Sequence, residues 1–312
     1  LMNGLPHFDA AAIRSIVDMP ACIEALRTGS LLLGDLHPRT QVSLGPTDDF
    51  LMMPAVSPAG IGVKIVNVIS DNRDRDLPLI HGFYLYCDRE TGVPTATLDG
   101  SALTTLRTPA ASALAADLVA RPDASTLGIF GTGVQARGHV EAMLVVRPGI
   151  TRILVAGRTP QSSAVFVTDP EVIDLAGGRA LVAADPQETA GCDIVCGCTS
   201  STTPVVPTGA VRPGAHVGLV GSYSVARREV DSDLVNLASV FVDNRHAAAA
   251  EAGDLMVPAA DGEWSFDHVV GDLAELCSGT AGRASEDEVT LFKSVGLAAW
   301  DLIVASAVVR AG

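Results

Sequence analysis

The feature that most constrains the fold of this chain is a glycine-rich turn between an apolar strand and a helix. Residues 126–143 read TLGIFGTGVQARGHVEAM, with Gly131, Gly133 and Ala136 spaced as G-x-G-x-x-A. The first glycine allows a tight turn, the second lets a phosphate approach the backbone, and the alanine lets the helix lie close to the strand. This order predicts a Rossmann-type unit that holds a dinucleotide pyrophosphate at the helix N-terminus. The predicted contacts are Gly131, Thr132, Gly133, Val134 and Gln135. The alternative is a turn that binds no ligand.

Segments with strand and helix character alternate after this turn. Strands are predicted at 126–130, 152–156, 180–183, 194–198, 216–220 and 240–242. Alternation at this spacing is typical of a parallel, doubly wound sheet, so we expect an α/β protein with a Rossmann domain at 122–291. Residues 1–121 mix helices with short strands, which indicates a mixed α+β domain. This domain is completed by 292–312, since residues 286–310 return to a helical pattern.

The end of the second predicted strand bears on the choice of cofactor. An acidic residue there would bind the ribose hydroxyls of NAD. The sequence instead reads Ala156-Gly157-Arg158-Thr159, and Arg158 with Thr159 can hold the 2′-phosphate of NADP. NADP(H) is therefore the preferred cofactor. NAD(H) stays possible, because Arg158 can also stack on adenine.

Composition and charge narrow the class of partner. The 312 residues carry a formal net charge of −15, so binding to nucleic acid or to an anionic membrane surface is not expected. No stretch approaches the roughly 18–20 apolar residues that span a bilayer, which favours a cytoplasmic location. Cys192, Cys196 and Cys198 lie close together, but no His is near them, so no metal site is expected. Small molecules are the expected partners.

Three isolated cations stand in neutral or apolar sequence in the first third of the chain. They are Arg39, Lys64 and Arg107. An unpaired buried charge costs several kcal/mol, so an anionic ligand at these side chains would explain their presence. Pairing with a local acid such as Asp35 or Asp99 is the alternative.

Arg107 also has a distinctive predicted place beside a helix end. Residues 101–120 are almost all Ala, Leu, Thr and Ser, and they are expected to form a pair of buried helices. Thr108 is the expected N-cap and Pro109 the first residue of the second helix. A cation beside a positive helix end is unfavourable by itself, which again indicates an anion nearby.

A group of acidic residues follows the last predicted strand of the doubly wound sheet. Asp243, Glu251 and Asp254 are expected to lie at the N-terminal turn of a helix, where carboxylates are favourable. No catalytic role is predicted for them.

Eight short segments spread over nearly the whole chain match one known family. They are Pro38–Thr40, Met53–Ala55, Gly62–Lys64, and the residues 90–100, 106–113, 131–137, 213–221 and 291–298. In these segments the sequence resembles the ornithine cyclodeaminase and mu-crystallin family. Similar proteins include cyclodeaminases, alanine-type dehydrogenases, ketimine reductases and a hormone-binding crystallin, so the resemblance leaves the reaction open.

The resemblance implies a homodimer in which the mixed domain binds substrate and pairs the subunits, while the Rossmann domain carries the cofactor. It also implies roles for single residues. Arg39 and Lys64 match the family's substrate-carboxylate positions, and Arg107 matches a position near cofactor and substrate. Val295 matches a position beside the substrate. The positions that match the nicotinamide side are Thr199, Val220, Gly221, Ser222 and Ser294.

The sequence departs from the cyclodeaminases of the family at one position. Those enzymes carry an Asp two positions after the glycine that matches Gly221, where this chain has Tyr223. A phenol with a pKa of about 10 is a poor base at neutral pH, which argues against ornithine cyclisation. The residues that remain suit hydride transfer to a 2-imino acid, or the reverse oxidation of an amino acid. Lys64, His81 and Tyr223 are the candidate proton donors.

Three functions are therefore weighed. The leading hypothesis is an NADP(H)-dependent imino-acid or ketimine reductase, or an amino-acid dehydrogenase. A cyclodeaminase that recycles tightly held NAD is the second. The third is a non-catalytic protein that binds a small molecule in the presence of NADPH, in the manner of the crystallin.

Overall fold

The computed structural model describes residues 4–33, 36–45, 48–75, 77–221 and 224–312. The chain forms two compact units. The first unit comprises Leu1–Arg107 and Leu297–Gly312, and the second comprises Thr108–Gly296. No helix among the described residues is long and apolar enough to cross a membrane.

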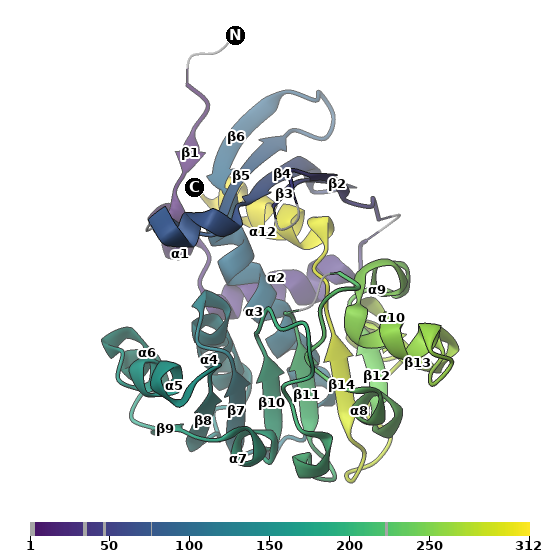
Figure 1. Ribbon diagram of the computed structural model, residues 1–312. Helices are drawn as coiled ribbons and strands as arrows, with labels where there is room; N and C mark the ends of the chain where they lie inside the picture. The colour runs from purple at the N-terminus through teal and green to yellow at the C-terminus, as the bar shows by residue number, and fades with distance from the viewer. Residues whose placement is uncertain (1–3, 34–35, 46–47, 76, 222–223) are drawn as a thin grey trace. The chain divides into compact units, whose positions relative to one another are not determined.

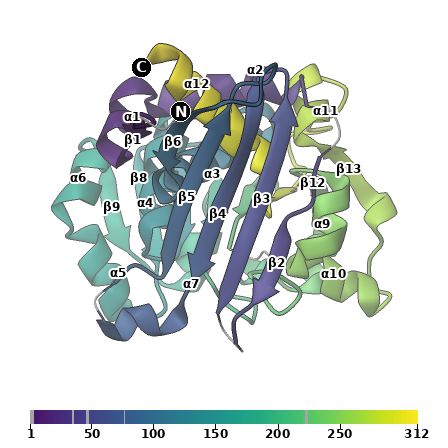
Figure 2. The same ribbon diagram turned by 90° about the horizontal axis from the view of Figure 1, so that it is seen from above.

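The first unit is built on a six-stranded sheet in the order β1-β6-β5-β4-β3-β2. The strands are β1 (His7–Phe8), β2 (Thr40–Ser43), β3 (Asp49–Ser57), β4 (Gly60–Val68), β5 (Ile80–Cys87) and β6 (Pro94–Asp99). All neighbours are antiparallel except β1 and β6. Figure 2 shows β5, β4, β3 and β2 side by side. The short strands predicted before residue 122 are therefore confirmed as one continuous meander.

Three helices accompany this sheet. They are α1 (Ala10–Ile16), α2 (Met19–Ser30) and the C-terminal α12 (Ala298–Ala311). Asp9 and Asp18 cap the first two by accepting backbone N–H bonds, and Pro20 occupies the first turn of α2, where its missing N–H costs nothing. Helix α12 packs against α2, β3 and β4, so the C-terminal helix completes the unit that begins at the N-terminus.

Burial alternates along the central strands, and this defines two faces of the sheet. In β4 every second residue is buried, including Lys64, and the residues between are half-exposed. The register pairs Lys64 with Tyr84 and Asn67 with His81. Because side chains alternate across a strand, Lys64 and Tyr84 share the inner face, while His81 lies on the outer face.

The second unit is built on an eight-stranded parallel sheet in the order β13-β12-β14-β11-β10-β7-β8-β9. The strands are β7 (Thr126–Phe130), β8 (Arg152–Ala156), β9 (Ala180–Ala183), β10 (Ile194–Gly197), β11 (His216–Leu219), β12 (Ser239–Val242), β13 (Val269–Asp272) and β14 (Thr290–Lys293). Its helices are α4 (Val134–Val146), α5 (Pro160–Val167), α6 (Pro170–Ala176), α7 (Pro186–Ala190), α8 (Ser232–Leu237), α9 (Arg245–Glu251), α10 (Gly253–Ala260) and α11 (Leu273–Ser278). The predicted α/β fold with a doubly wound parallel sheet is confirmed.

The prediction of a helical pattern from residue 286 was wrong for β14. This strand lies between β11 and β12, where Figure 1 shows it in yellow among green strands. All four of its residues are buried, so it lacks the alternation by which a half-exposed strand is recognised. A four-residue buried strand directly before a helix, with two polar residues among the four, therefore gave no separate strand signal.

The prediction of two helices at 101–120 was also wrong. A single helix, α3 (Gly100–Val119), runs through Pro109, so Thr108 is no N-cap and Arg107 lies inside the helix. Proline removes one helical hydrogen bond, but nearly every residue of α3 after Thr105 is buried, and packing outweighs that loss. The cap is Asp99, whose carboxylate accepts from two backbone N–H groups at the start of the helix.

Candidate active site

The glycine-rich turn has the backbone geometry that its sequence predicts. Gly131 has a φ of +110°, in a region that favours glycine, and its N–H donates to the carbonyl of Ala156 at 2.9 Å. A Cβ atom on Gly131 would lie 2.7 Å from the carbonyl oxygen of Cys198. Any side chain here would therefore displace one of the neighbouring strand ends.

Gly133 stands at the N-terminus of α4, and its surroundings differ from those of Gly131. It is the N-cap residue, with no side chain to accept the first N–H groups of the helix, and a Cβ added to it would meet nothing within 4 Å. Ala136, one turn later, is fully buried. An uncapped, exposed helix N-terminus with open space in front of its glycine fits a pyrophosphate group.

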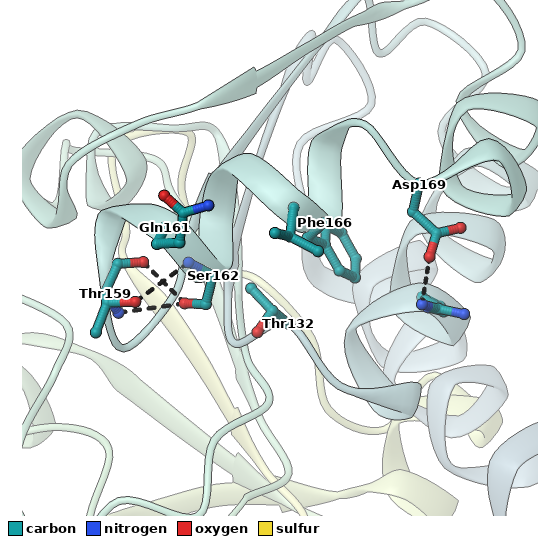
Figure 3. Close-up of a pocket in the computed structure, with 8 residues that line it drawn as sticks. Thr132, Thr159, Gln161, Ser162, Phe166 and Asp169 are labelled. Atoms are coloured by element: carbon teal, nitrogen blue, oxygen red, sulfur yellow. Dashed lines mark hydrogen bonds and ion pairs between the residues drawn. The ribbon is translucent and has the colours of Figure 1, made fainter.

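A cavity of about 330 Å³ opens beside this turn. It is lined by Thr132, Arg137, Thr159, Gln161, Ser162, Val165, Phe166 and Asp169. Figure 3 shows Thr159 and Ser162 in the reciprocal hydrogen bonds that start α5, and Asp169 bonded to an arginine. That arginine is Arg137, whose guanidinium lies 2.6 Å from the carboxylates of Asp169 and Glu171.

The residues predicted to decide cofactor specificity lie at the N-terminus of α5. Arg158 is exposed and Thr159 is the N-cap of the helix. Neither side chain is needed for the core. The Arg158 side chain is therefore available to a ligand that reaches the end of β8, and the Thr159 hydroxyl, whose oxygen accepts from the N–H of Ser162, can still donate to one.

Two turns at the carboxyl ends of β10 and β11 contain predicted nicotinamide-side residues. Thr199 follows β10, while Val220 and Gly221 follow β11. A buried carboxylate that the sequence did not single out, Glu229, accepts hydrogen bonds from both turns. The predicted residues Ser222 and Tyr223 lie outside the described residues.

A second buried carboxylate holds the turn after β14. Asp243 accepts from the Ser294 hydroxyl at 3.1 Å, and from the N–H groups of Val295 and Gly296 at 2.7 and 2.8 Å. Burial raises the pKa of Asp243, although these hydrogen bonds act against the shift. The prediction of Asp243 as a carboxylate of a helix N-terminal turn was therefore wrong, because Asn244 caps the following helix instead.

Asp254 also has partners that its predicted place did not indicate. It lies in the first turn of α10, as predicted, but is completely buried, and its carboxylate accepts from the N–H groups of Glu229 and Val230. Its other oxygen lies 3.0 Å from the ammonium of Lys293, which is equally buried. This buried pair holds the end of β14 beside the segment that carries Glu229.

In the first unit, two of the predicted cations meet at one carboxylate. The Lys64 ammonium lies 2.8 Å from Asp301 and donates to the Thr104 hydroxyl at 3.0 Å. The Arg107 guanidinium lies 3.1 Å from the other oxygen of Asp301. All three charged side chains are buried. The suggested partner Asp99 is a helix cap instead, and Asp35 lies outside the described residues.

Asp301 was not predicted as a site residue, although the sequence contains a signal for it. Asp301 is the one acid in the apolar run Ala298–Val309, which is the same kind of isolated charge that singled out the three cations. The C-terminal helix was expected to complete this unit, but none of its charges was expected to meet Lys64.

Burial and the neighbouring charges shift the pKa values of Lys64 and Asp301 in this cluster. Burial lowers the pKa of Lys64 to about 8, with Asp301 raising it and the charges of Arg107 and Arg39 lowering it further. Burial would raise the pKa of Asp301, but Lys64 and Arg107 outweigh that effect and the pKa is lowered. The carboxylate is therefore ionised at neutral pH, while the lysine can give up its proton.

The structure does not bring His81 to this cluster. His81 is exposed on the outer face of the sheet, whereas Lys64 faces inward toward α12. The remaining predicted cation, Arg39, is half-buried, and its charge acts on Lys64. Within the described part of the chain, no group of three or more His, Cys, Asp or Glu side chains could hold a metal ion.

A parallel, doubly wound sheet with a glycine-rich, uncapped helix N-terminus defines a dinucleotide-binding protein of the α/β class. The model of the ornithine cyclodeaminase/mu-crystallin family matches residues 12–311. The chain belongs to this family, which confirms the resemblance found in the sequence.

Relatives and solved structures narrow the comparison. The Delta(1)-pyrroline-2-carboxylate reductase of Paracoccus denitrificans is 36% identical over 294 residues, covering 92% of this chain and 91% of the relative. That of Bacillus cereus is 38% identical over 260 residues, covering 82% and 79%. The solved structure of the Thermococcus litoralis reductase in complex with NADH and L-proline has a TM-score of 0.92 at 30% identity, covering 98% of this chain and 96% of that one. An archaeal alanine dehydrogenase dimer with bound NAD has a TM-score of 0.91 at 28% identity, covering 98% and 95%.

Proposed function

We propose that this chain reduces a cyclic 2-imino acid of the Δ1-pyrroline-2-carboxylate type to the corresponding amino acid. The chain is an oxidoreductase that acts on CH–NH groups of small imino or amino acids with a nicotinamide cofactor, in line with its relatives. The observation that carries the proposal is the buried cluster of Lys64, Arg107 and Asp301. Two cations share one carboxylate there, which leaves a positive charge for a substrate carboxylate.

The residues of the cluster have separate roles in this proposal. Arg39 and Arg107 bind the substrate carboxylate, and Asp301 keeps Lys64 and Arg107 oriented. Lys64 donates a proton to the imine nitrogen, which its pKa of about 8 makes feasible near neutral pH. A bound nicotinamide supplies the hydride to the imine carbon. The cofactor is held by the turn residues Gly131–Gln135, with Thr199, Val220, Gly221, Ser222 and Ser294 on the nicotinamide side and Val295 beside the substrate. The predicted roles of His81 and Tyr223 as proton donors are not needed.

The direct test is an assay of purified protein with NADPH and a set of imino acids. The set contains five- and six-membered cyclic 2-imino acids and the open-chain imine formed from pyruvate and ammonia. Consumption of NADPH with a cyclic member is the expected result. Release of ammonia from ornithine without added cofactor would favour the cyclodeaminase instead. Binding of NADPH without turnover of any member would favour the non-catalytic binding protein.

We also propose a preference for NADP(H) over NAD(H). It is supported by the exposed residue Arg158 and by its neighbour Thr159, whose side chain lines the cavity beside the glycine-rich turn. A charge-assisted hydrogen bond contributes about 1.5–3 kcal/mol, so Arg158→Ala should weaken NADPH binding roughly tenfold to a hundredfold. Its affinity for NADH should change little. Tighter binding of NADH than of NADPH to the unaltered protein would overturn the proposal.

A homodimer through the first unit is the proposed assembly. The outer face of its sheet carries exposed apolar side chains, among them Val42, Val56 and Phe83. Such a surface is typical of protein interfaces. Phe83→Arg should shift the protein from dimer to monomer in light scattering. A cytoplasmic location stays a prediction.

A further inference from the structure

Glu229 connects the turns that follow two adjacent strands of the parallel sheet. One carboxylate oxygen accepts from the backbone N–H of Thr199 at 2.7 Å and from its hydroxyl at 2.9 Å. The other oxygen accepts from the N–H of Gly221 at 2.8 Å. Thr199 follows β10 and Gly221 follows β11, so a single side chain fixes the distance between both turns.

The packing around this carboxylate leaves no room for adjustment. A Cβ atom on Gly221 would lie 1.7 Å from the carbonyl oxygen of Thr199 and 2.7 Å from the Glu229 carboxylate. A Cβ on Gly197 would lie 3.0 Å from the same carboxylate. Both glycines therefore let the strand ends close around Glu229, which is fully buried.

The segment that carries Glu229 is itself fixed at its backbone. The backbone N–H of Glu229 donates to Asp254 at 2.5 Å, and the Glu229 carbonyl accepts from the N–H groups of Val205 and Val206 at 2.8 and 3.1 Å. Lys293 neutralises Asp254 at 3.0 Å. The side chain therefore projects from a rigid frame, and its position is determined by residues from β14 and α10.

Burying this carboxylate works against its ionisation. Burial raises the pKa of Glu229 to about 6, with Asp254 raising it, and Lys293 and the hydrogen bonds from the two turns lowering it. Among the described residues, the thiols of Cys196 on β10 and of Cys198 directly after it also interact with this carboxylate. The three hydrogen bonds from the two turns offset part of this desolvation cost, so the ionised carboxylate and the geometry of the turns depend on each other.

We propose that Glu229 is a positioning residue that, as a carboxylate, holds the Thr199 and Val220–Gly221 turns in the geometry required for hydride transfer. The inference rests on the proposed function, in which these turns line the nicotinamide. Glu229 acts through the two turns and touches neither the substrate nor the reacting atoms.

Protonation is the natural way to loosen this connection. A carboxylic acid keeps fewer acceptor sites than the carboxylate, and of the three groups that donate to it only the Thr199 hydroxyl can turn to accept its O–H. The proposal therefore gives a rate of hydride transfer that falls as the pH drops through about 6. Glu229→Gln replaces one oxygen by an NH₂ group at nearly the same size, so it should behave at every pH as the protonated enzyme does.

The experiment compares Glu229→Gln with a matched control, Asp193→Asn. Asp193 likewise ties two strands of the same sheet, through Ser125 and Thr126 at their amino ends. With NADPH and Δ1-pyrroline-2-carboxylate, Glu229→Gln should lower kcat by about tenfold to a hundredfold, because small misplacements of reacting groups cost that much. It should also raise the isotope effect from C4-deuterated NADPH and remove the acid limb of the pH profile. Asp193→Asn should change none of the three.

A ligand without nicotinamide separates positioning from a general loss of structure. Binding of 2′,5′-ADP should be equal in wild type and Glu229→Gln, since the residues proposed to bind the 2′-phosphate are distant in sequence from both turns. An unchanged kcat, isotope effect and pH profile in Glu229→Gln would overturn the proposal. It would also be overturned if Glu229→Gln lost 2′,5′-ADP binding to the same extent as it lost activity. If the wild type reduces no imino acid, the proposed function fails. NADPH should then still bind Glu229→Gln more weakly than wild type, and equal binding would overturn the role of Glu229.

Discussion

At both ends of the parallel sheet in the second unit, carboxylates accept hydrogen bonds that join two strands, but the carboxylates at the two ends differ in burial. At the amino end, Asp193 joins β7 and β10 by accepting from the backbone and hydroxyls of Ser125 and Thr126. At the carboxyl end, Glu229 joins β10 and β11, and Asp243 joins β12 and β14. Every one of these carboxylates ties two strands, but only the last two are buried.

The difference appears in the pKa of each group. Partial desolvation raises the pKa of Asp193, but its hydrogen bonds outweigh this and the net shift is downward. Burial dominates at Glu229 and Asp243, whose pKa values are raised. By linkage, the ionised Asp193 stabilises the fold, whereas ionising the other two costs stability. The two carboxylates whose pKa is raised, Glu229 and Asp243, both lie at the carboxyl end of the sheet, where ligands bind in sheets of this kind.

In the first unit, two substitutions on opposite faces of the sheet should show the largest difference between a functional and a structural position. Lys64→Met removes the buried ammonium beside Asp301, and kcat/KM for the imino acid should fall by about 10²–10⁴ through loss of the general acid. The matched control is His81→Ala, on the outer face of the same sheet, which should change kcat/KM less than about twofold. Steady-state kinetics measures both. Equal losses in the two variants would show that the face of the sheet does not decide function.

The buried pair of Asp254 and Lys293 should give the largest effect on stability. Asp254→Asn leaves the ammonium of Lys293 buried without its counterion, which should lower the free energy of unfolding by about 3–5 kcal/mol. The exposed Asp233→Asn should change it by less than about 0.5 kcal/mol. Urea denaturation gives both values. If Asp254→Asn with Lys293→Met is no more stable than Asp254→Asn alone, the pair does not account for the loss.

The two glycines of the turn should separate folding from cofactor binding. Gly131→Ala places a Cβ 2.7 Å from a carbonyl at a φ of +110°, so it should cost about 1–3 kcal/mol of stability. Gly133→Ala meets open space and should change stability by less than about 0.5 kcal/mol while weakening NADPH binding. Thermal unfolding and fluorescence titration with NADPH measure the two effects. An NADPH affinity unchanged in Gly133→Ala would remove that residue from the pyrophosphate site.

The smallest effect should come from Asp193, and it has a defined sign with pH. Its pKa is lowered in the folded state, so its contribution is present above the unfolded pKa of about 3.9 and is lost as the pH falls through the folded value. Asp193→Asn should therefore be less stable than wild type at neutral pH, and the difference should shrink in acid. The raised pKa of Glu229 gives the opposite slope between pH 4.5 and about 6. A difference for Asp193→Asn that grows in acid would contradict the assignment.

The sequence predicted the local features of the fold better than the long-range contacts. The turn at Gly131 and the strand Thr126–Phe130 carry their signals in adjacent residues, and both are confirmed. The partner of Lys64 lies 237 positions away, at Asp301, and pairings over such distances are decided by tertiary packing. Pro109 was interpreted as a helix start because local propensity cannot register that burial outweighs one lost hydrogen bond.

Following the transferred hydrogen tests the central claim most directly. Purified protein would be given Δ1-pyrroline-2-carboxylate and NADPH that carries deuterium at both C4 positions, and the product would be analysed by mass spectrometry and NMR. The account predicts proline with one deuterium on its Cα, formed by the wild type and by His81→Ala at similar rates and by Lys64→Met about 10²–10⁴ times more slowly. Proline without deuterium, or formation of the labelled product by Lys64→Met at the wild-type rate, would contradict it.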